Sequence, residues 1–247
     1  MEAIRLSGTF LAGVMASFIG SMAGSGGLIS IPFLIILGIP PHTAVATHRV
    51  GAVGLQLGAL SRFSKSKEIV WKYVEHMCVL ALIASQIGSR LLLDTDQPTL
   101  KHIIVIVMLV MLPIILMDSN MGLKSIETSW FRKAVGYIVL SLTFIWQAYF
   151  GGAAATMTLY AITFFFGTTI NSANATSKIP GLLLSLSTLL IFSAHGIVNW
   201  TYGITLFFGM LFGGYLGVHT ALSKGNALVK WLFAGVALLS AAKMALE

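Results

Sequence analysis

The chain contains few charged residues. Of its 247 residues, 9% are Asp, Glu, Lys or Arg, whereas 57% are hydrophobic. A soluble domain has about 25% charged residues, so this composition excludes an ordinary soluble protein. Apolar runs close to the ~20 residues that a helix needs to cross a bilayer follow one another, and the alternating pattern of a membrane β-barrel is missing. We therefore predict an all-α membrane protein, a polytopic helical bundle in the lipid bilayer.

Signatures of catalysis and of cofactor binding are missing as well. The single cysteine, Cys78, excludes an intrachain disulfide. The histidines show no metal-ligand spacing, and the chain has neither a P-loop nor a nucleophile elbow. We therefore expect a protein that is not an enzyme and that binds no metal and no cofactor.

Carboxylates are rare inside the apolar runs, where Glu75 and Asp118 lie near the predicted ends. A cation carrier or an acid-relay proton pump normally needs a buried carboxylate, so the substrate we expect is a small anion. The net charge of +7 could indicate nucleic acid, but the 15 Lys and Arg are scattered through the loops. We expect them to orient the chain in the bilayer, with no nucleic-acid partner.

The chain repeats itself at an offset of 129 residues, without a gap. The offset pairs Gly38 with Gly167, Thr47 with Thr176, Arg49 with Lys178, Phe63 with Phe192, Trp71 with Trp200, Tyr73 with Tyr202, and Gly88 with Gly217. Chance rarely keeps a tryptophan, a basic residue and several glycines in one register. We infer a first five-helix repeat over 1–118, a polar linker over 119–132 and a second five-helix repeat over 133–247.

The apolar pattern predicts about ten helical segments, two of them short. The segments are 4–23, 27–37, 43–61, 73–93, 101–117, 133–149, 153–166, 171–193, 200–222 and 228–245. Segment 27–37 is about half of a membrane span, at 1.5 Å of rise per residue. Whether it and 153–166 cross the bilayer stays open.

Basic residues predict how the two repeats are oriented. Ten crossings with both termini outside place nine Lys and Arg in inside loops and four in outside loops. The equivalent loops 61–72 and 194–199 hold four basic residues and none. Parallel repeats would put both loops on the same side, so we predict inverted-topology repeats.

A glycine-rich stretch interrupts the first repeat. Gly24, Ser25, Gly26 and Gly27 follow one another, and Pro32 comes soon after. Gly costs a helix about 1 kcal/mol and Pro about 3 kcal/mol relative to Ala, so we expect the helix to open here. Scattered glycines have a simpler explanation in close helix packing. The second repeat breaks at the corresponding place, at Gly151 and Gly152. Backbone N–H groups freed at such breaks favour an anion.

Each repeat has one basic residue about two turns into its third segment. These residues are Arg49 in "ATHRVG" and Lys178 in "ATSKIP". Either could snorkel to the interface, but their symmetry and the polar residues on the same helix face favour the bundle interior. We predict that both bind substrate. Neutral partners in the same site are expected from Thr47, His48, Asn171, Asn174, Ser177 and Gln147. His48 could also relay a proton or simply pack, and simple packing is equally open for Gln147.

These motifs resemble the TauE/SafE sulfite exporter family. The resemblance rests on Gly24 to Gly27, Pro32, the turn Gly38 to Pro40, Ala44 to Arg49 and Ala173 to Lys178, and it covers nearly the whole chain. The family motif commonly reads Thr-Asn-Lys where this chain has Thr47-His48-Arg49. The resemblance implies a multi-pass transporter of the bacterial inner membrane for sulfite, organosulfonates or other small anions.

The sequence therefore predicts an exporter of a small sulfur-containing anion that works by alternating access around a midplane site. An anion leaves a cell downhill, because the negative interior contributes about 2.3 kcal/mol per charge and 100 mV. The alternative is a proton- or sodium-coupled uptake permease, or a channel, for another small anion or organic acid. Assembly into a homo-oligomer stays open.

Overall fold

The computed structural model describes residues 1–24, 26–116, 125–151 and 154–224, and within these ranges the chain forms nine helices and no strand. The helices are α1 (Glu2–Ala23), α2 (Gly27–Ile36), α3 (Pro41–Phe63), α4 (Trp71–Asp94), α5 (Gln97–Leu116), α6 (Trp130–Tyr149), α7 (Ala154–Phe166), α8 (Ile170–Ala194) and α9 (Trp200–Lys224). The all-helical class is confirmed. Of these nine described helices, four are long and apolar enough to cross a membrane: α1, α4, α8 and α9.

The predicted segments match these helices closely. The largest differences are at α5, which begins four residues before the predicted 101–117, and at α6, which begins at Trp130, inside the predicted linker 119–132. Ser129 explains the early start, because its hydroxyl accepts a hydrogen bond from the Arg132 N–H and caps the helix. The tenth predicted segment, 228–245, lies outside the described residues.

A glycine ends the first helix of each predicted repeat. Gly24 follows α1 with φ of 84°, and Gly151 follows the last turn of α6 with φ of 83°. Only glycine adopts this left-handed region without a steric penalty, so both helices stop here. The helices that follow are short: α2 has 10 residues and α7 has 13.

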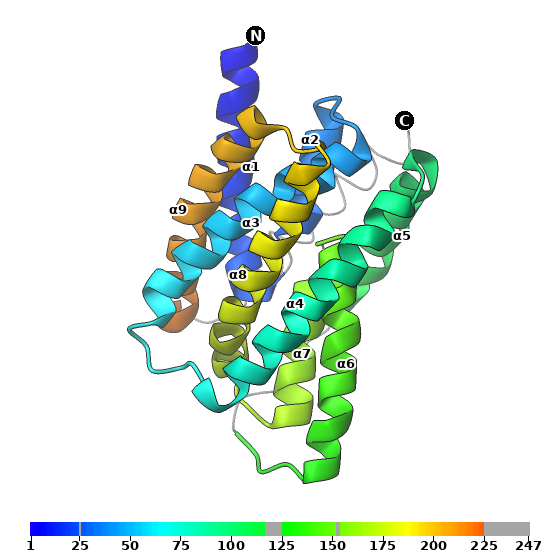
Figure 1. Cartoon of the computed structure of the whole chain (residues 1–247). Coiled ribbons are helices and arrows are strands. Elements are labelled where there is room, and N and C mark those ends of the chain that lie inside the picture. Colours follow the sequence, from blue (N-terminus) through cyan, green and yellow to red (C-terminus); the bar gives the residue numbers. More distant parts are fainter. Residues whose placement is uncertain (25, 117–124, 152–153, 225–247) are drawn as a thin grey trace.

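The two interruptions meet in the middle of the molecule. Figure 1 shows α1 entering from the end where the N-terminus lies and α6 entering from the opposite end, and α2 and α7 return toward the ends from which α1 and α6 came. A Cβ atom on Gly24 would lie 2.7 Å from the Thr156 nitrogen and 2.9 Å from the Ala155 oxygen. The chain near Gly24 therefore touches the first turn of α7.

The fourth helix of each predicted repeat packs on helices of the other one. α9 packs against α1 and α3, and α4 packs against α6 and α8 (Figure 1). We call α1, α2, α3 and α9 the first bundle and α4, α6, α7 and α8 the second bundle. Glycines allow the close approach in the first bundle, since a Cβ atom on Gly54 would overlap the carbonyl group of Phe207.

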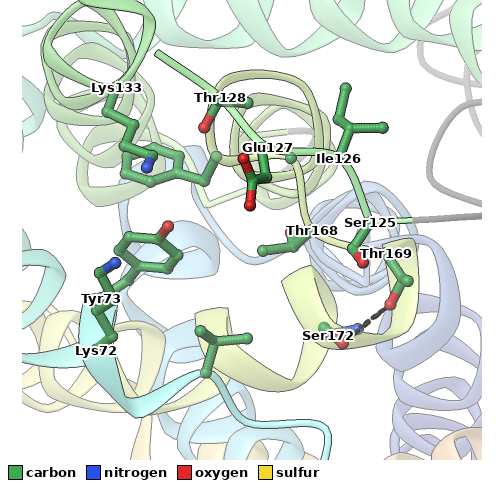
Figure 2. Close-up of a pocket in the computed structure, with 13 residues that line it drawn as sticks. Lys72, Tyr73, Ser125, Ile126, Glu127, Thr128, Lys133, Thr168, Thr169 and Ser172 are labelled. Carbon is green, nitrogen blue, oxygen red and sulfur yellow. Dashed lines mark hydrogen bonds between the residues drawn. The ribbon is translucent and has the colours of Figure 1, made fainter. Parts of the chain in front are cut away.

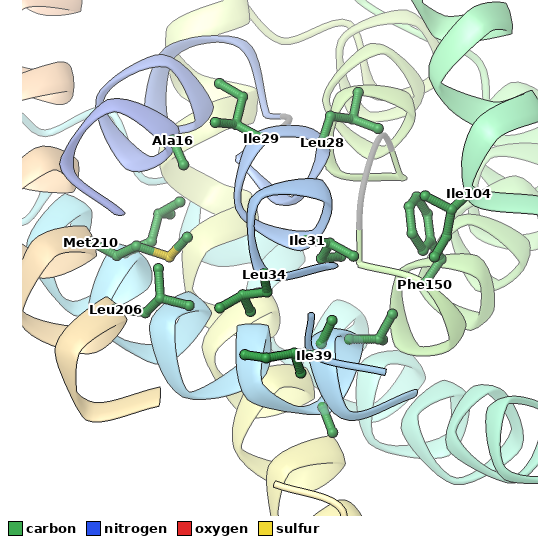
Figure 3. Close-up of a cluster of buried hydrophobic side chains, with 14 of the residues drawn as sticks. Ala16, Leu28, Ile29, Ile31, Leu34, Ile39, Ile104, Phe150, Leu206 and Met210 are labelled. Carbon is green, nitrogen blue, oxygen red and sulfur yellow. The ribbon is translucent and has the colours of Figure 1, made fainter. Parts of the chain in front are cut away.

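The short helix α2 is surrounded by protein. Leu28, Ile31 and Leu34 are each at most 1% exposed, and α2 carries a single polar residue, Ser30. Figure 3 shows these side chains radiating from α2, with Met210 of α9 on one side and Phe150 on the other. A helix that is apolar on all sides has to be enclosed. This enclosure is what makes a half-length helix tolerable inside a membrane protein.

Candidate functional site

The side chain of Arg49 holds the broken end of α6. Its Nη2 atom donates to the carbonyl oxygens of Gln147, at 2.5 Å, and Ala148, at 2.7 Å. Both carbonyls belong to the last turn of α6, where no intrahelical N–H is available to them, and a cation is favoured at this end of a helix. A Cβ atom at Gly151 would lie 3.1 Å from Nη1, so the missing side chain leaves room for the guanidinium. Arg49 is 1% exposed.

The broken end of α1 is held in a similar way, but by an uncharged side chain. Asn174 of α8 donates from Nδ2 to the carbonyl oxygen of Ser21 at 2.7 Å. Each bundle therefore supplies, from its third-segment helix, a side chain that binds the open end of the first-segment helix in the other bundle. Asn174 stands one turn before Lys178, which is the residue that the 129-residue offset pairs with Arg49.

Lys178 lies at 4% exposure in α8. Within the described ranges, its ammonium group has neither a hydrogen-bond partner nor an acidic partner. The ammonium nitrogen is not fully enclosed by protein. A buried charge is costly unless it is paired. Lys178 is therefore the cation of this region that most needs a counterion.

His48 is connected to the first interruption by a short hydrogen-bond chain. Its Nδ1 atom lies 2.7 Å from the Ser30 hydroxyl, and that hydroxyl lies 3.3 Å from the carbonyl oxygen of Gly26. A hydroxyl has one hydrogen, which can point to Gly26 or to Nδ1, so the tautomer of His48 sets which of the two contacts Ser30 donates to. Ser30 was not among the predicted site residues, although its place as the one polar residue of 27–36 is a usable signal.

The other predicted site residues divide into two groups. Gly26, Gly27 and Gln147 are buried at the interruptions, whereas Thr47 accepts from the Asn199 N–H at 3.0 Å and Ser177 donates to the Asn174 carbonyl oxygen of its own helix. Asn171 is partly buried in the first turn of α8. Ser25 and Gly152 lie outside the described residues. Substrate binding by this set stays a prediction.

A cavity of about 490 Å³ lies elsewhere, between the first turns of α4, α6 and α8 (Figure 2). Lys72, Lys133 and Glu127 line it, together with Thr168 and the first-turn residue Ser172. None of the predicted site residues borders this cavity. Sequence reasoning missed it because its walls come from parts of the chain that carry no shared motif.

The family model described as "Sulfite exporter TauE/SafE" matches residues 9–244. The chain belongs to the TauE/SafE family.

Relatives support the same assignment. A "Probable membrane transporter protein" of Haemophilus influenzae is 25% identical over 236 residues, 95% of this chain and 92% of the relative. The "Probable membrane transporter protein YfcA" of Escherichia coli is 25% identical over 235 residues, 95% of this chain and 87% of the relative. A "Probable membrane transporter protein ORF9" of Sinorhizobium is 24% identical over 241 residues. No solved structure matches the chain.

Family membership and the apolar helices together make this TauE/SafE protein a multi-pass transporter of the bacterial inner membrane. It therefore handles a small-molecule substrate in the setting of a lipid bilayer.

Proposed function

We propose that the protein exports a small sulfur-containing anion, such as sulfite or an organosulfonate, by alternating access around an anion site midway between two inverted repeats. One observation carries this proposal: the two interruptions touch, and the helix behind each one contributes a buried basic residue, Arg49 or Lys178. Interrupted helices in corresponding positions of two repeats are the usual substrate site of secondary transporters.

Reciprocal contacts support repeats over 1–118 and 133–247, joined by 119–132. The Thr47 hydroxyl accepts from the Asn199 N–H, and the Thr176 hydroxyl accepts from the Val70 N–H, both at 3.0 Å. The 129-residue offset pairs Thr47 with Thr176 and Val70 with Asn199, so the two hydrogen bonds occupy equivalent positions in the two repeats. Contacts that exchange in this way are expected when two units are related by a two-fold axis. The opposite entry of α1 and α6 in Figure 1 is what an axis in the membrane plane predicts.

The proposed site uses charge and opened backbone. Arg49 and Lys178 attract the anion, and the backbone at Gly26 and Gly27 and at Gly151 supplies N–H donors, whereas the Gly24 N–H is already bonded to the Gly20 carbonyl oxygen. Neutral contacts would come from His48, Asn171, Asn174 and their neighbours. The chemistry is binding and release, with no bond made or broken in the substrate.

The bodies that move against each other are the two bundles in this proposal. Helices of one bundle pack closely, as the Gly54 contact with Phe207 shows, and each bundle contains one interruption. Between the bundles lie the contacts of α3 with α8 and of the two interruptions. Rocking about that seam would open the site first to one side and then to the other.

The test is efflux from proteoliposomes loaded with sulfite, thiosulfate, sulfate, sulfoacetate or formate, with a potassium control. We expect export of a sulfur-containing anion by the wild type and at least a tenfold loss in Arg49→Gln/Lys178→Gln. Arg90→Gln is the matched control, because Arg90 is an exposed cation of α4. Wild-type rates in the double variant would refute the site, and transport of potassium alone would refute the anion substrate. Sodium- or pH-driven accumulation would establish the uptake alternative, and single-channel conductance would establish a channel.

A further inference from the structure

We infer that the two buried basic residues have different roles: Lys178 binds the anion, and Arg49 is a positioning residue that holds the broken end of α6 beside it. This inference rests on the proposed function. It departs from the equal roles that the repeat predicts for the pair.

Both N–H groups of the Arg49 Nη2 atom are already committed. Nη2 carries two hydrogens, and it makes one bond to Gln147 and one to Ala148. Nε has no partner within the described part of the chain and is itself enclosed, so a ligand cannot reach it. An arginine binds an oxyanion best through two parallel N–H groups, and both possible pairs include Nη2. Only Nη1 remains, which excludes the two-pronged contact in this arrangement.

The contact of Arg49 with α6 also explains why it is an arginine. Two adjacent carbonyl oxygens at a helix end need two N–H donors that lie close together. The planar guanidinium provides both from Nη2 in a fixed geometry. Because Gly151 has no side chain, the guanidinium can lie directly against the backbone there. The charge of Arg49 is therefore balanced in part by the negative end of the α6 dipole.

Lys178 is free from that task because Asn174 performs it for α1. The amide of Asn174 binds the Ser21 carbonyl oxygen, so the first interruption is held without a charge. Lys178 keeps three donors and a full charge at 4% exposure. A small anion would pair this charge, and this requirement is weaker at Arg49, whose guanidinium already binds two carbonyl oxygens.

The experiment measures binding of sulfite and sulfoacetate to the purified protein by calorimetry, and thermal unfolding of the same samples. Lys178→Met removes a buried charge that has no partner among the described residues, so we expect its melting temperature to equal or exceed that of the wild type. Its affinity for the anion should fall at least tenfold. Arg49→Met should instead unfold at a lower temperature, and Arg49→Lys should recover part of that loss.

Restoring the charge separates binding from folding. In a Cys78→Ser background, Lys178→Cys is alkylated with bromoethylamine, which rebuilds an ammonium of nearly the same length, and excess reagent is removed. We expect the alkylated protein to regain anion binding and the unmodified one to lack it. Undiminished binding in Lys178→Met, or a tenfold loss in Arg49→Lys at an unchanged melting temperature, would overturn the assigned roles.

Failure of the proposed function gives a different result. A wild-type protein that binds and exports none of the anions overturns both proposals. A wild type that binds sulfite, together with a Lys178→Met variant that binds it equally well, overturns only the division of roles. The Arg90→Gln control should match the wild type in affinity and in melting temperature.

Discussion

Replacing Gly213 by Ala tests whether α9 packs on α1 as closely as the structure shows. A Cβ atom at Gly213 would overlap the Val14 carbonyl oxygen and lie 2.9 Å from the Val14 Cα. The helices would have to separate, and overpacking of this kind costs about 1–3 kcal/mol. Gly8 of α1 is the matched control, because a Cβ atom there would lie 3.5 Å from the Phe33 ring, an ordinary contact.

Both substitutions gain the same helix propensity of about 1 kcal/mol, so their difference isolates the contact. For a chain of this size, 1 kcal/mol shifts the melting temperature by about 2–4 °C. Gly8→Ala should therefore melt roughly 2–12 °C above Gly213→Ala in detergent, by differential scanning fluorimetry. Equal melting temperatures would refute a close α1–α9 contact.

Three further results are expected. In a Cys78→Ser background, Ser85→Cys/Ser187→Cys should form a disulfide, because the two hydroxyls lie 2.7 Å apart. The disulfide should leave efflux intact, since both residues belong to the second bundle. Efflux that returns only on reduction would refute rocking of the bundles. Thr47→Val should lower the melting temperature by about 1–6 °C through the lost bond from Asn199, and Thr176→Val should lower it at least as much, because Thr176 also donates to the Ser172 carbonyl oxygen. Thr→Ser is the control at each site, and a loss at one site alone would contradict the symmetry. For an exported monovalent anion, an interior potential of −100 mV should make the concentration outside roughly fifty times that inside at equilibrium. A concentration ratio that does not depend on the potential would exclude uncoupled export.

Local features of this chain were predictable from its sequence. Helix ends depend on residues such as Gly24 and Gly151, whose conformational effect acts within a turn. The pairing of Arg49 with Lys178 follows from internal repetition, which needs no knowledge of packing. The membrane class follows from composition, because lipid restricts the chain to helices.

Contacts between distant parts of the chain were not predictable in the same way. Arg49 binds main-chain carbonyl groups of α6, and every residue type presents such a group, so no side chain marks the partner. The packing of α9 on α1 depends on which glycine faces meet, and both α4 and α9 offer small residues. The equal roles predicted for the two basic residues rested on symmetry, whereas the helix ends they approach are held by different side chains.

The exchange of fourth helices has a consequence for how the protein is made. The ribosome releases α1, α2 and α3 early, but the helix that fills the space between α1 and α3 is α9, near the other end of the chain. The first bundle therefore waits in the membrane, with its glycine faces open to lipid or to a chaperone, until most of the protein has been inserted. A half-length chain could close its bundle only by joining a second copy in the opposite orientation.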